Sequence, residues 1–400
     1  MFRFGYARAG RTRGLGSPRI LTGVSSLSSS KRAAWFGLVG VTAAAVTSCA
    51  GEPVDITAAG GSPTCSNSAQ VEQWPLGRRL GQVLMGAVNL DAGEDAIDEA
   101  TRAVAHNRVT GVNFFGTGGW VLEDNGLART LDAGGEVPPL LAVDEEGGQV
   151  QRISGLTGWL PSARDSATSK TPQGVRDSAK ELGWIMKSVS LNTDLAPVVD
   201  VGDGPLGDRT YSTDPDEVTA YAGAFADGLR RADVIPTLKH FPGMGRATGN
   251  TDYGTATTPP LSKLEETDLV PYRRLLKDGG RVMVMTANAA VPQLTDGVPA
   301  SLSPATYELL RGDLGYDGVA ITDSLSAEAT LTGQSLTEAV EAALVAGADI
   351  ALWDSLDEAP KIRKQLRRAV REGRLSEERL NEAVARVLAL KGVDLCVGRD

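Results

Sequence analysis

The chain has 400 residues, with 50 acidic against 40 basic side chains and a formal net charge of −10. A content of 42% hydrophobic and 22% charged residues is that of a globular protein and excludes wholesale disorder and a fibrous repeat. The acidic balance argues against nucleic acid as a partner. Only two histidines, His106 and His240, are present, which excludes most histidine-built metal sites. We therefore expect neither a metal nor a cofactor.

Residues 1–48 have the layout of an export signal. They carry seven basic side chains and no acidic one, and an apolar run over 33–46 follows the last of these basic residues. The run is too short and too rich in alanine and glycine for a membrane span. Its end, Val46-Thr-Ser-Cys49, resembles a bacterial lipobox, in which the cysteine becomes the lipidated first residue of the mature protein. We predict a signal peptide over 1–48 that ends in this lipobox, with lipidation of Cys49.

This prediction places the protein outside the cell, held by a lipid anchor in the outer face of the cytoplasmic membrane and facing the cell wall. A plain signal peptide cleaved nearby is the alternative. Residues 49–72 are rich in glycine, serine, alanine and proline and are predicted to be a flexible tether. In an oxidising compartment, Cys65 and Cys396 are the remaining candidates for a disulfide, with two unpaired thiols as the alternative.

The rest of the chain alternates between short apolar runs and amphipathic stretches. Strands are predicted, in chain order, at 82–88, 111–115, 139–144, 191–198, 234–240, 281–286, 318–323 and 348–353. Helices are predicted between most of them, at 95–106, 172–188, 215–232, 267–278, 303–314 and 336–346. Strong helical periodicity over 361–390 ends the pattern.

Eight buried strands covered by helices predict an α/β fold, a (β/α)8 TIM-type barrel that forms a single catalytic domain over 73–396. A doubly wound open sheet is the alternative. No glycine-rich dinucleotide fingerprint follows the first strand and no Walker-type sequence occurs, so that alternative lacks its usual nucleotide-binding support.

In such barrels the chemistry lies where the strands end. Here the strand ends carry carboxylates, a Lys-His pair and an amide: Asp144, Lys239, His240, Asn288, Asp323 and Asp354. None of these ends carries a cysteine or a serine in a Gly-x-Ser-x-Gly elbow. A carboxylate-rich mouth without a phosphate cradle favours sugar chemistry over acyl or phosphoryl transfer.

Five motifs in this order and spacing resemble those of family 3 glycoside hydrolases, specifically the single-domain bacterial β-N-acetylhexosaminidases, surface lipoproteins among them. They are Asp144-Glu-Glu-Gly-Gly-Gln-Val-Gln-Arg152, Leu195-Ala-Pro-Val-Val-Asp200, Asp208-Arg-Thr-Tyr211, Lys239-His-Phe-Pro-Gly243 and Thr322-Asp-Ser-Leu325. The resemblance covers nearly all of residues 75–392. It implies release of N-acetylglucosamine from cell-wall (peptidoglycan) fragments, with no metal or cofactor.

The resemblance also assigns roles. Asp323 is implied to be the nucleophile of a retaining reaction, which forms a glycosyl-enzyme that water then hydrolyses. The residues implied to bind the sugar are Asp144, Arg152, Arg209, Lys239 and His240. Plainer alternatives are a helix-capping role for Asp323, a core position for His240 and a loop ion pair for Arg209.

The loop after the Lys-His-Phe-Pro-Gly motif departs from the family pattern. The resemblance implies an acid/base histidine that is oriented by an aspartate two residues before it, but this chain has Asn250 and Asp252 at these places. Two further histidines of the pattern are replaced by Met244 and Asn288. The family's proton donor is therefore absent from the loop.

Three hypotheses follow. Asp252 is the candidate acid/base, because carboxylates do this work in most glycosidases. Alternatively, the chain is a catalytically impaired sugar-binding lipoprotein; loss of acid catalysis alone typically costs roughly 10²–10⁴-fold. In the third hypothesis Glu145 or Glu146 supplies the proton. Residues 355–400 are too few to form a second domain that brings one.

Overall fold

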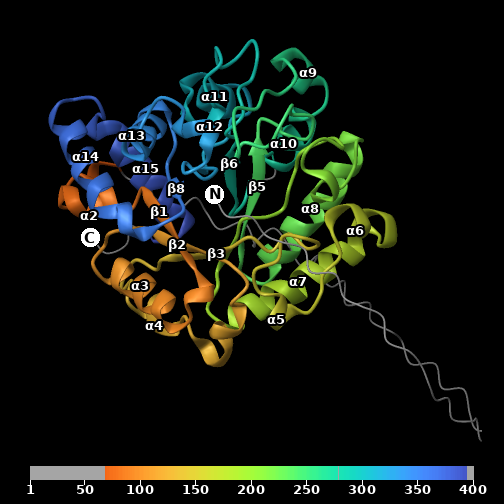
Figure 1. Ribbon diagram of the computed structural model, residues 1–400, viewed down its shortest axis with the longest axis horizontal. Helices are drawn as coiled ribbons and strands as arrows, with labels where there is room; N and C mark the ends of the chain where they lie inside the picture. The colour runs from red at the N-terminus through yellow and green to blue at the C-terminus, as the bar shows by residue number, and fades with distance from the viewer. Residues whose placement is uncertain (1–67, 278, 394–400) are drawn as a thin grey trace, which may run out of the picture. The chain divides into compact units, whose positions relative to one another are not determined.

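The computed structural model describes residues 68–277 and 279–393 (Figure 1). The predicted leader, the lipidation site Cys49 and the disulfide candidates Cys65 and Cys396 lie outside these residues. Within the described ranges, no helix is both long enough and apolar enough to cross a membrane.

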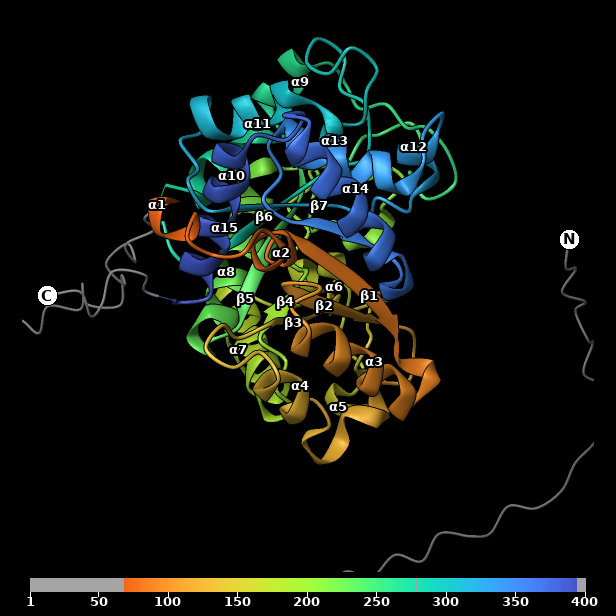
Figure 2. The ribbon, with the colours of Figure 1, turned by 90° about the vertical axis from the view of Figure 1, so that its left-hand side faces the viewer.

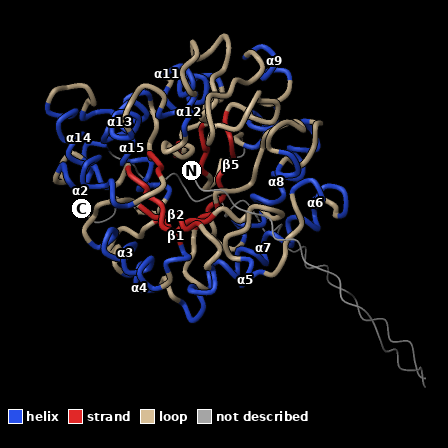
Figure 3. Tube along the Cα trace, in the orientation of Figure 1, coloured by secondary structure: helices blue, strands red, loops and turns tan. Residues whose placement is uncertain are grey.

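The described residues form one eight-stranded sheet in which paired strands run parallel, in the order β7-β6-β5-β4-β3-β2-β1-β8. The strands gather at the centre with helices around them (Figure 3). Their bounds are β1 Leu84–Asn89, β2 Gly111–Phe115, β3 Leu140–Val143, β4 Thr193–Asp194, β5 Ile235–Phe241, β6 Met283–Thr286, β7 Val319–Thr322 and β8 Ala351–Trp353.

The barrel closes between β7 and β8 through a parallel bridge of Ile321 with Ile350. At this seam the backbone N–H of Thr322 donates to the carbonyl of Ile350 at 3.0 Å, and the N–H of Leu352 donates to the hydroxyl of Thr322 at 3.0 Å. The predicted (β/α)8 fold is confirmed.

Helices cover the outside of the sheet (Figures 1 and 2). Their bounds are α1 Ser68–Val71, α2 Leu76–Gly81, α3 Glu94–Ala105, α4 Ala128–Asp132, α5 Ser154–Thr157, α6 Ala163–Ser169, α7 Pro172–Ser188, α8 Pro215–Arg231, α9 Leu261–Glu266, α10 Leu269–Leu275, α11 Pro304–Glu308, α12 Glu328–Leu331, α13 Leu336–Ala346, α14 Ala359–Arg371 and α15 Glu377–Leu390. Short 3-10 turns lie at Leu90–Ala92, Gly119–Asn125, Gly207–Arg209, Ala300–Leu302 and Leu356–Glu358, and a π turn at Leu309–Asp313.

Start signals in the sequence explain where several of these helices begin. Thr171 caps α7 by accepting a hydrogen bond from Gly174, and a proline opens the helix. Ser335 and Glu338 form a capping box at the start of α13. Both helices occupy the predicted ranges, 172–188 and 336–346.

Two predicted elements differ in the structure. The strand expected over 191–198 is reduced to β4. Beyond it the chain makes single hydrogen bonds to β5, such as that from the N–H of Val199 to the carbonyl of Lys239, and no longer forms a regular strand. The helical stretch 361–390 is two helices, because Gly373 takes a φ of 74° and Ser376 caps a new helix by accepting from Arg379.

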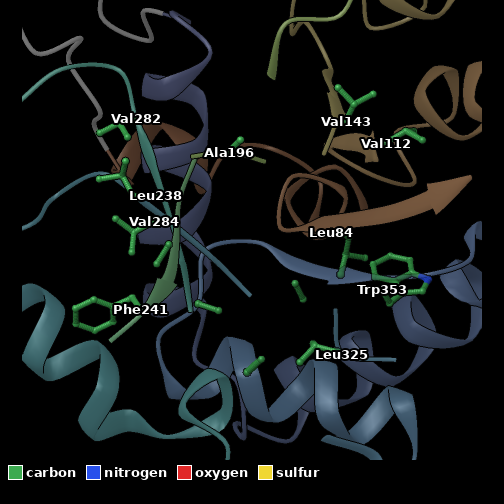
Figure 4. Close-up of a cluster of buried hydrophobic side chains, with 14 of the residues drawn as sticks. Leu84, Val112, Val143, Ala196, Leu238, Phe241, Val282, Val284, Leu325 and Trp353 are labelled. Carbon is green, nitrogen blue, oxygen red and sulfur yellow. The ribbon is translucent and has the colours of Figure 1, made fainter. Parts of the chain in front are cut away.

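Alternating strand residues build two apolar layers. One set points outward and packs under the helices; it includes Leu84, Val143, Val284 and Trp353 (Figure 4). The other set, with Met85 and Met283 among it, forms a separate cluster that also contains Val387 and Leu390 of α15. The last helix therefore contributes to the inner core, and the polar residues are left for the strand ends.

Candidate active site

The polar residues predicted at the strand ends form one connected site. Asp144 directly follows β3, Lys239 and His240 lie within β5, and Asp323 directly follows β7. Lys239 forms an ion pair with Asp144, and both Lys239 and His240 act electrostatically on the Asp323 carboxyl group. The structure thus brings these four predicted residues together.

Lys239 is the central cation of this site. Its Nζ lies 2.6 Å from Asp144 Oδ1 and 2.6 Å from Glu146 Oε1. Arg209 binds Glu146 through two parallel hydrogen bonds of 2.8 Å. Asn113 of β2 donates to the second oxygen of Asp144 at 3.3 Å. The Asp144 side chain stays 20% exposed while that of Lys239 is 2% exposed, so the carboxylate forms the accessible edge of the network.

The charges in this network hold each other ionised. Burial acts to raise the pKa of Glu146, but Lys239 and Arg209 lower it to about 2. Burial acts to lower the pKa of Lys239, but Asp144 and Glu146 raise it. Glu146 therefore carries no proton to donate near neutral pH, which removes it as the acid of the third hypothesis.

Glu145 is occupied in a different way. One oxygen accepts from Gln151 Nε2 at 2.9 Å and the other from the backbone N–H groups of Arg152 and Ile153 at 2.6 and 3.0 Å. Burial raises the pKa of this carboxyl group, although these hydrogen bonds act to lower it. The side chain is fully buried. It holds the loop after β3 in place and is not exposed to a substrate.

His240 is oriented by Asp200. Its Nδ1 lies 2.7 Å from Asp200 Oδ2, and its backbone N–H donates to the same oxygen at 3.1 Å. The other oxygen of Asp200 accepts from the backbone N–H of Met244. One buried carboxylate thus fixes the imidazole and the beginning of the loop that carries Asp252.

The Asp323 carboxylate is positioned for attack. Its Oδ1 accepts from the backbone N–H of Ser324 at 2.7 Å, while no donor in the described ranges contacts Oδ2. Burial raises its pKa; His240 and Lys239 lower it, and Asp252 raises it further. The two cations offset part of the burial penalty on the ionised form that a nucleophile requires, but the pKa of Asp323 stays raised.

Ser324 links Asp323 to a carboxylate on the neighbouring strand end. Its hydroxyl donates to Asp354 Oδ1, directly after β8, and its carbonyl accepts from Asn288 Nδ2 at 2.7 Å. Burial, together with the charges of Asp252 and Asp144, raises the pKa of Asp354. Two hydrogen bonds and one serine span the two carboxyl groups, which places their bonded oxygens at most about 9 Å apart.

Asp252 is an exposed residue of the loop after β5. Its charge acts on both Asp323 and Asp354, so it belongs to the same mouth. Asn250 does not orient the Asp252 carboxylate: its side-chain oxygen accepts from the backbone N–H of Asp252 at 2.9 Å. The loop is tied to α12 through the Ala329 N–H, which donates to the carbonyl of Thr251 at 3.1 Å.

Two polar groups of the region have no partner within the described part of the chain. Arg152 Nε is buried without an acceptor, and the Arg152 guanidinium forms no ion pair there. Asp194 is fully buried, accepts from the Glu145 N–H through Oδ1, and leaves Oδ2 without a donor. Burial raises the pKa of Asp194 well above its usual range. An unpartnered Arg152 agrees with the predicted sugar-binding role.

Sequence reasoning missed several residues of the site. Glu146 was considered only as a proton donor, yet it joins Lys239 to Arg209. Asp200 ended a recognised motif without an assigned role, and Asn113 lies inside an apolar strand that gives no polar signal. Asp354 stood on the predicted rim without a role. No cluster of three or more metal-ligating side chains occurs in the described ranges.

A barrel with a carboxylate aimed from the end of its seventh strand and a Lys-carboxylate network beside it defines a class of sugar-cleaving enzymes. Residues 76–390 match the glycosyl hydrolase family 3 N-terminal domain. The chain belongs to glycosyl hydrolase family 3 and is a glycosidase of that family.

Curated relatives agree with this assignment. The chain is 42% identical over 332 residues to the beta-hexosaminidase LpqI of Mycobacterium tuberculosis, covering 80% of this chain and 84% of that one. It is 34% identical to a beta-hexosaminidase of Tolumonas auensis, covering 67% and 82% of the two chains. These relatives bear the names of enzymes, so they do not favour the predicted alternative of a binding protein without activity.

Solved structures of similar proteins have the same fold. M. tuberculosis LpqI superposes with a TM-score of 0.76 at 40% identity, covering 81% of this chain and 96% of that chain. A beta-N-acetylhexosaminidase of Beutenbergia cavernae superposes with a TM-score of 0.72 at 29% identity, covering 80% and 99%.

Proposed function

We propose that this protein is a retaining β-N-acetylhexosaminidase that releases N-acetylglucosamine from cell-wall fragments through a glycosyl-enzyme on Asp323. The observation that carries the proposal is the Asp323 carboxylate near the Lys239–Asp144 pair, whose Oδ2 accepts no hydrogen bond from the residues that the structure describes. The names of the relatives support the hexosaminidase activity. The wall-fragment substrate rests on the family resemblance and on the lipobox-like Cys49 segment.

Sugar binding is assigned to the network around Lys239. Asp144 can accept two hydroxyl hydrogen bonds at its exposed edge, and Lys239 beside it has a further N–H to donate. Arg209 uses Nε and Nη2 for Glu146, which leaves its Nη1 group for the ligand. His240 and Arg152 complete the set. Together these groups hold the ring while Asp323 attacks the anomeric carbon.

The leaving oxygen needs a proton, and we assign the donor to Asp252. It stands on the loop over the mouth, and its charge and that of Asp354 act on each other. Asp354 is fixed by Ser324, whereas no side chain in the described ranges fixes the Asp252 carboxylate. The exposed Asp252 carboxylate is therefore the better placed of the two to meet the leaving group.

The nucleophile is tested by hydrolysis of p-nitrophenyl N-acetyl-β-glucosaminide. Asp323→Asn keeps the shape but cannot form the glycosyl-enzyme, and we expect a loss of at least about 10³-fold. Asp317→Asn is the matched control, because Asp317 is exposed at the other end of the same strand. Equal activity of the wild type and Asp323→Asn would refute the assignment.

The donor is tested with two leaving groups. p-Nitrophenol leaves without a proton, whereas the sugar of a disaccharide does not. Asp252→Ala is therefore expected to reduce kcat/KM for disaccharide cleavage about 10²-fold or more, while kcat/KM for the aryl substrate, which reports formation of the glycosyl-enzyme, changes little. The kcat for the aryl substrate is expected to fall, because the same residue acts as the base when water hydrolyses the glycosyl-enzyme. Equal losses of kcat/KM on both substrates would assign Asp252 to binding. A selective loss in Asp354→Asn instead would move the donor to Asp354.

We also propose export and lipid anchoring through Cys49. The charge pattern of residues 1–48 and the Val46-Thr-Ser-Cys49 sequence support this location. Metabolic labelling with a fatty acid tests it: the wild type is expected to carry label in the membrane fraction and Cys49→Ser to lose it. Unlabelled protein released to the medium would favour the plain signal peptide.

A further inference from the structure

A groove lined by cations lies on the outside of the barrel. It has a volume of about 350 Å³ and is lined by Pro360 and five basic side chains, those of Arg108, Arg363, Lys364, Arg367 and Arg371. Throughout the described part of the chain, none of these five forms an ion pair. By contrast, Lys361 and Arg368 of the same helix pair with Glu358 and Glu372. The groove thus collects unneutralised charge in a chain whose net charge is −10.

Hydrogen bonds to the backbone hold Arg363 in the floor of the groove. Arg363 Nη1 donates to the carbonyls of Asn107 and Arg108 at 2.8 and 3.3 Å, and its Nη2 donates to the carbonyl of Gly77 at 2.8 Å. A Cβ at Gly77 would lie 2.9 Å from Arg367 Nη2, so the glycine lets this guanidinium approach the backbone of α2. Figure 2 shows α2 and α14 facing the same side of the barrel.

The charges nearest to Arg363 repel it. Burial lowers the pKa of Arg363, and the charges of Arg367 and Arg108 lower it further. No carboxylate is among the groups that shift it. Cations held this close without an acid are stabilised by any anion that enters between them.

We propose that this groove binds a linear polymer of phosphodiesters. Arg363, Arg367 and Arg371 follow each other at intervals of four residues, which places them about 6 Å apart along one face of α14. Lys364 and Arg108 flank this row. A flexible chain with one phosphate per unit can place successive charges on successive guanidinium groups, and arginine forks bind phosphate oxygens in pairs.

Other partners fit the groove less well. The exposed large apolar side chains of the described residues are Trp120, Trp159, Trp184, Tyr253, Val298 and Val345, and none of them lies on α14. A protein partner that docks through large apolar side chains would need such anchors. A membrane presents a flat layer of headgroups, whereas Arg363 lies half-buried in the floor. A narrow anionic chain reaches it.

The groove opens away from the catalytic mouth. Arg108 precedes β2 and Arg371 ends α14, whereas Asp144 and Asp323 follow their strands. Polymer binding therefore leaves Asp323 accessible and would hold the enzyme on an anionic polymer while the mouth works on another glycan.

The proposal is tested by binding, independently of turnover. Fluorescence anisotropy of a labelled poly(glycerol phosphate) oligomer, a linear phosphodiester, is measured with the full chain at several salt concentrations. We expect log Kd to rise with log salt with a slope of about 2–4, because roughly 0.7 counterion is released per phosphate of a single strand. Arg367→Gln/Arg371→Gln is expected to weaken binding about tenfold or more. Lys361→Gln/Arg368→Gln removes the same charge from the same helix and is expected to leave binding unchanged.

Three outcomes would overturn the proposal. Equal weakening in both double variants would show attraction by net charge alone. Equally tight binding of inorganic phosphate would show a site for a single anion. Binding to phosphatidylglycerol vesicles without binding to poly(glycerol phosphate) would assign the groove to a membrane. Thermal unfolding of each variant checks that it is folded, which we expect, since neither the Arg367 nor the Arg371 side chain makes a hydrogen bond to another described residue.

Discussion

The side-chain nitrogen of Asn288 lies 2.7 Å from the carbonyl oxygen of Ser324, the residue that follows the nucleophile. The Asn288 amide oxygen accepts from Ser301 Oγ at 2.7 Å, and the side chain is buried. Asn288 stands where the family resemblance implies a histidine. In this protein the position supports the peptide that holds Asp323.

Asn288→Ala is predicted to lower both stability and turnover. The substitution leaves a carbonyl and a hydroxyl without partners, which costs about 1–3 kcal/mol, and it frees the segment that orients Asp323. We expect kcat to fall more than KM rises, as measured by steady-state kinetics alongside urea unfolding. Ser301→Ala is the control, because it keeps the bond to Ser324. If Asn288→Ala were less stable but kept its kcat, the contact between Asn288 and Ser324 would have a structural role only.

Restoring the histidine loop is predicted to increase activity on poor leaving groups. Asn250→Asp/Asp252→His recreates the pair implied by the resemblance, and an imidazole with a pKa near about 6.5 is the better donor at neutral pH. The rate of disaccharide cleavage should rise. It should then fall with increasing pH as the new imidazole loses its proton. Asp252→His alone, without an orienting aspartate, should gain less. No gain in either variant would show that the loop does not reach the leaving group.

Glu146 is predicted to make the stability of the protein sensitive to acid. Its pKa is about 2 in the folded protein, below the usual value of 4.5, so its contribution is complete above pH 4.5. That contribution is lost as the pH falls toward 2, and its size is on the order of 3 kcal/mol. Glu146→Gln should flatten the dependence of the unfolding free energy on pH in this window. If the unfolding free energy of Glu146→Gln changed with pH as steeply as that of the wild type, the pairing with Lys239 and Arg209 would be contradicted.

Lys391 is predicted to make the stability of the protein rise with pH in the alkaline range as well. Burial lowers its pKa to about 7 from 10.5, while its Nζ donates to Gln82 Oε1 and the carbonyl of Thr110. Between pH 7 and 10.5 the unfolded chain binds a proton that the folded chain does not, so stability rises with pH in this range.

Lys391→Met should remove this slope. It should also stabilise the protein at neutral pH, where the buried amine costs on the order of 4 kcal/mol before its two hydrogen bonds are counted. Chemical unfolding at pH 7 and pH 9.5 measures both effects. Lys277→Met, at an exposed position, is the control and should change neither value. A wild type equally stable at both pH values would refute a depressed pKa.

The predictable part of the protein is the part dictated by local patterns. Continuous apolar runs such as Val319–Thr322 are buried on both faces and therefore read as parallel strands. The motifs placed Asp144, Lys239, His240 and Asp323 at strand ends, and the closed barrel brings such ends together. The prediction of these four as neighbours followed from topology and needed no side-chain detail.

The remainder depends on contacts between distant segments. Glu145 and Glu146 are adjacent and chemically alike, yet one folds a loop and the other neutralises Lys239. Sequence could not separate them, because the difference arises from which neighbour each carboxylate meets. For the same reason Asn250, placed to orient Asp252, instead closes a turn on its backbone. The helix break at Gly373 shows that one glycine outweighs a periodic pattern.

The end of α15 lies beneath the strands, where Arg281 Nε donates to the carbonyl of Leu390 at 2.7 Å and Lys391 reaches Thr110. Arg281 and Thr110 precede β6 and β2, on the side opposite the catalytic mouth. A bead or sensor chip coupled behind Val393 would therefore hold the barrel with its mouth turned outward. Immobilised in that orientation, the enzyme would meet even a bulky insoluble glycan without obstruction from its own support.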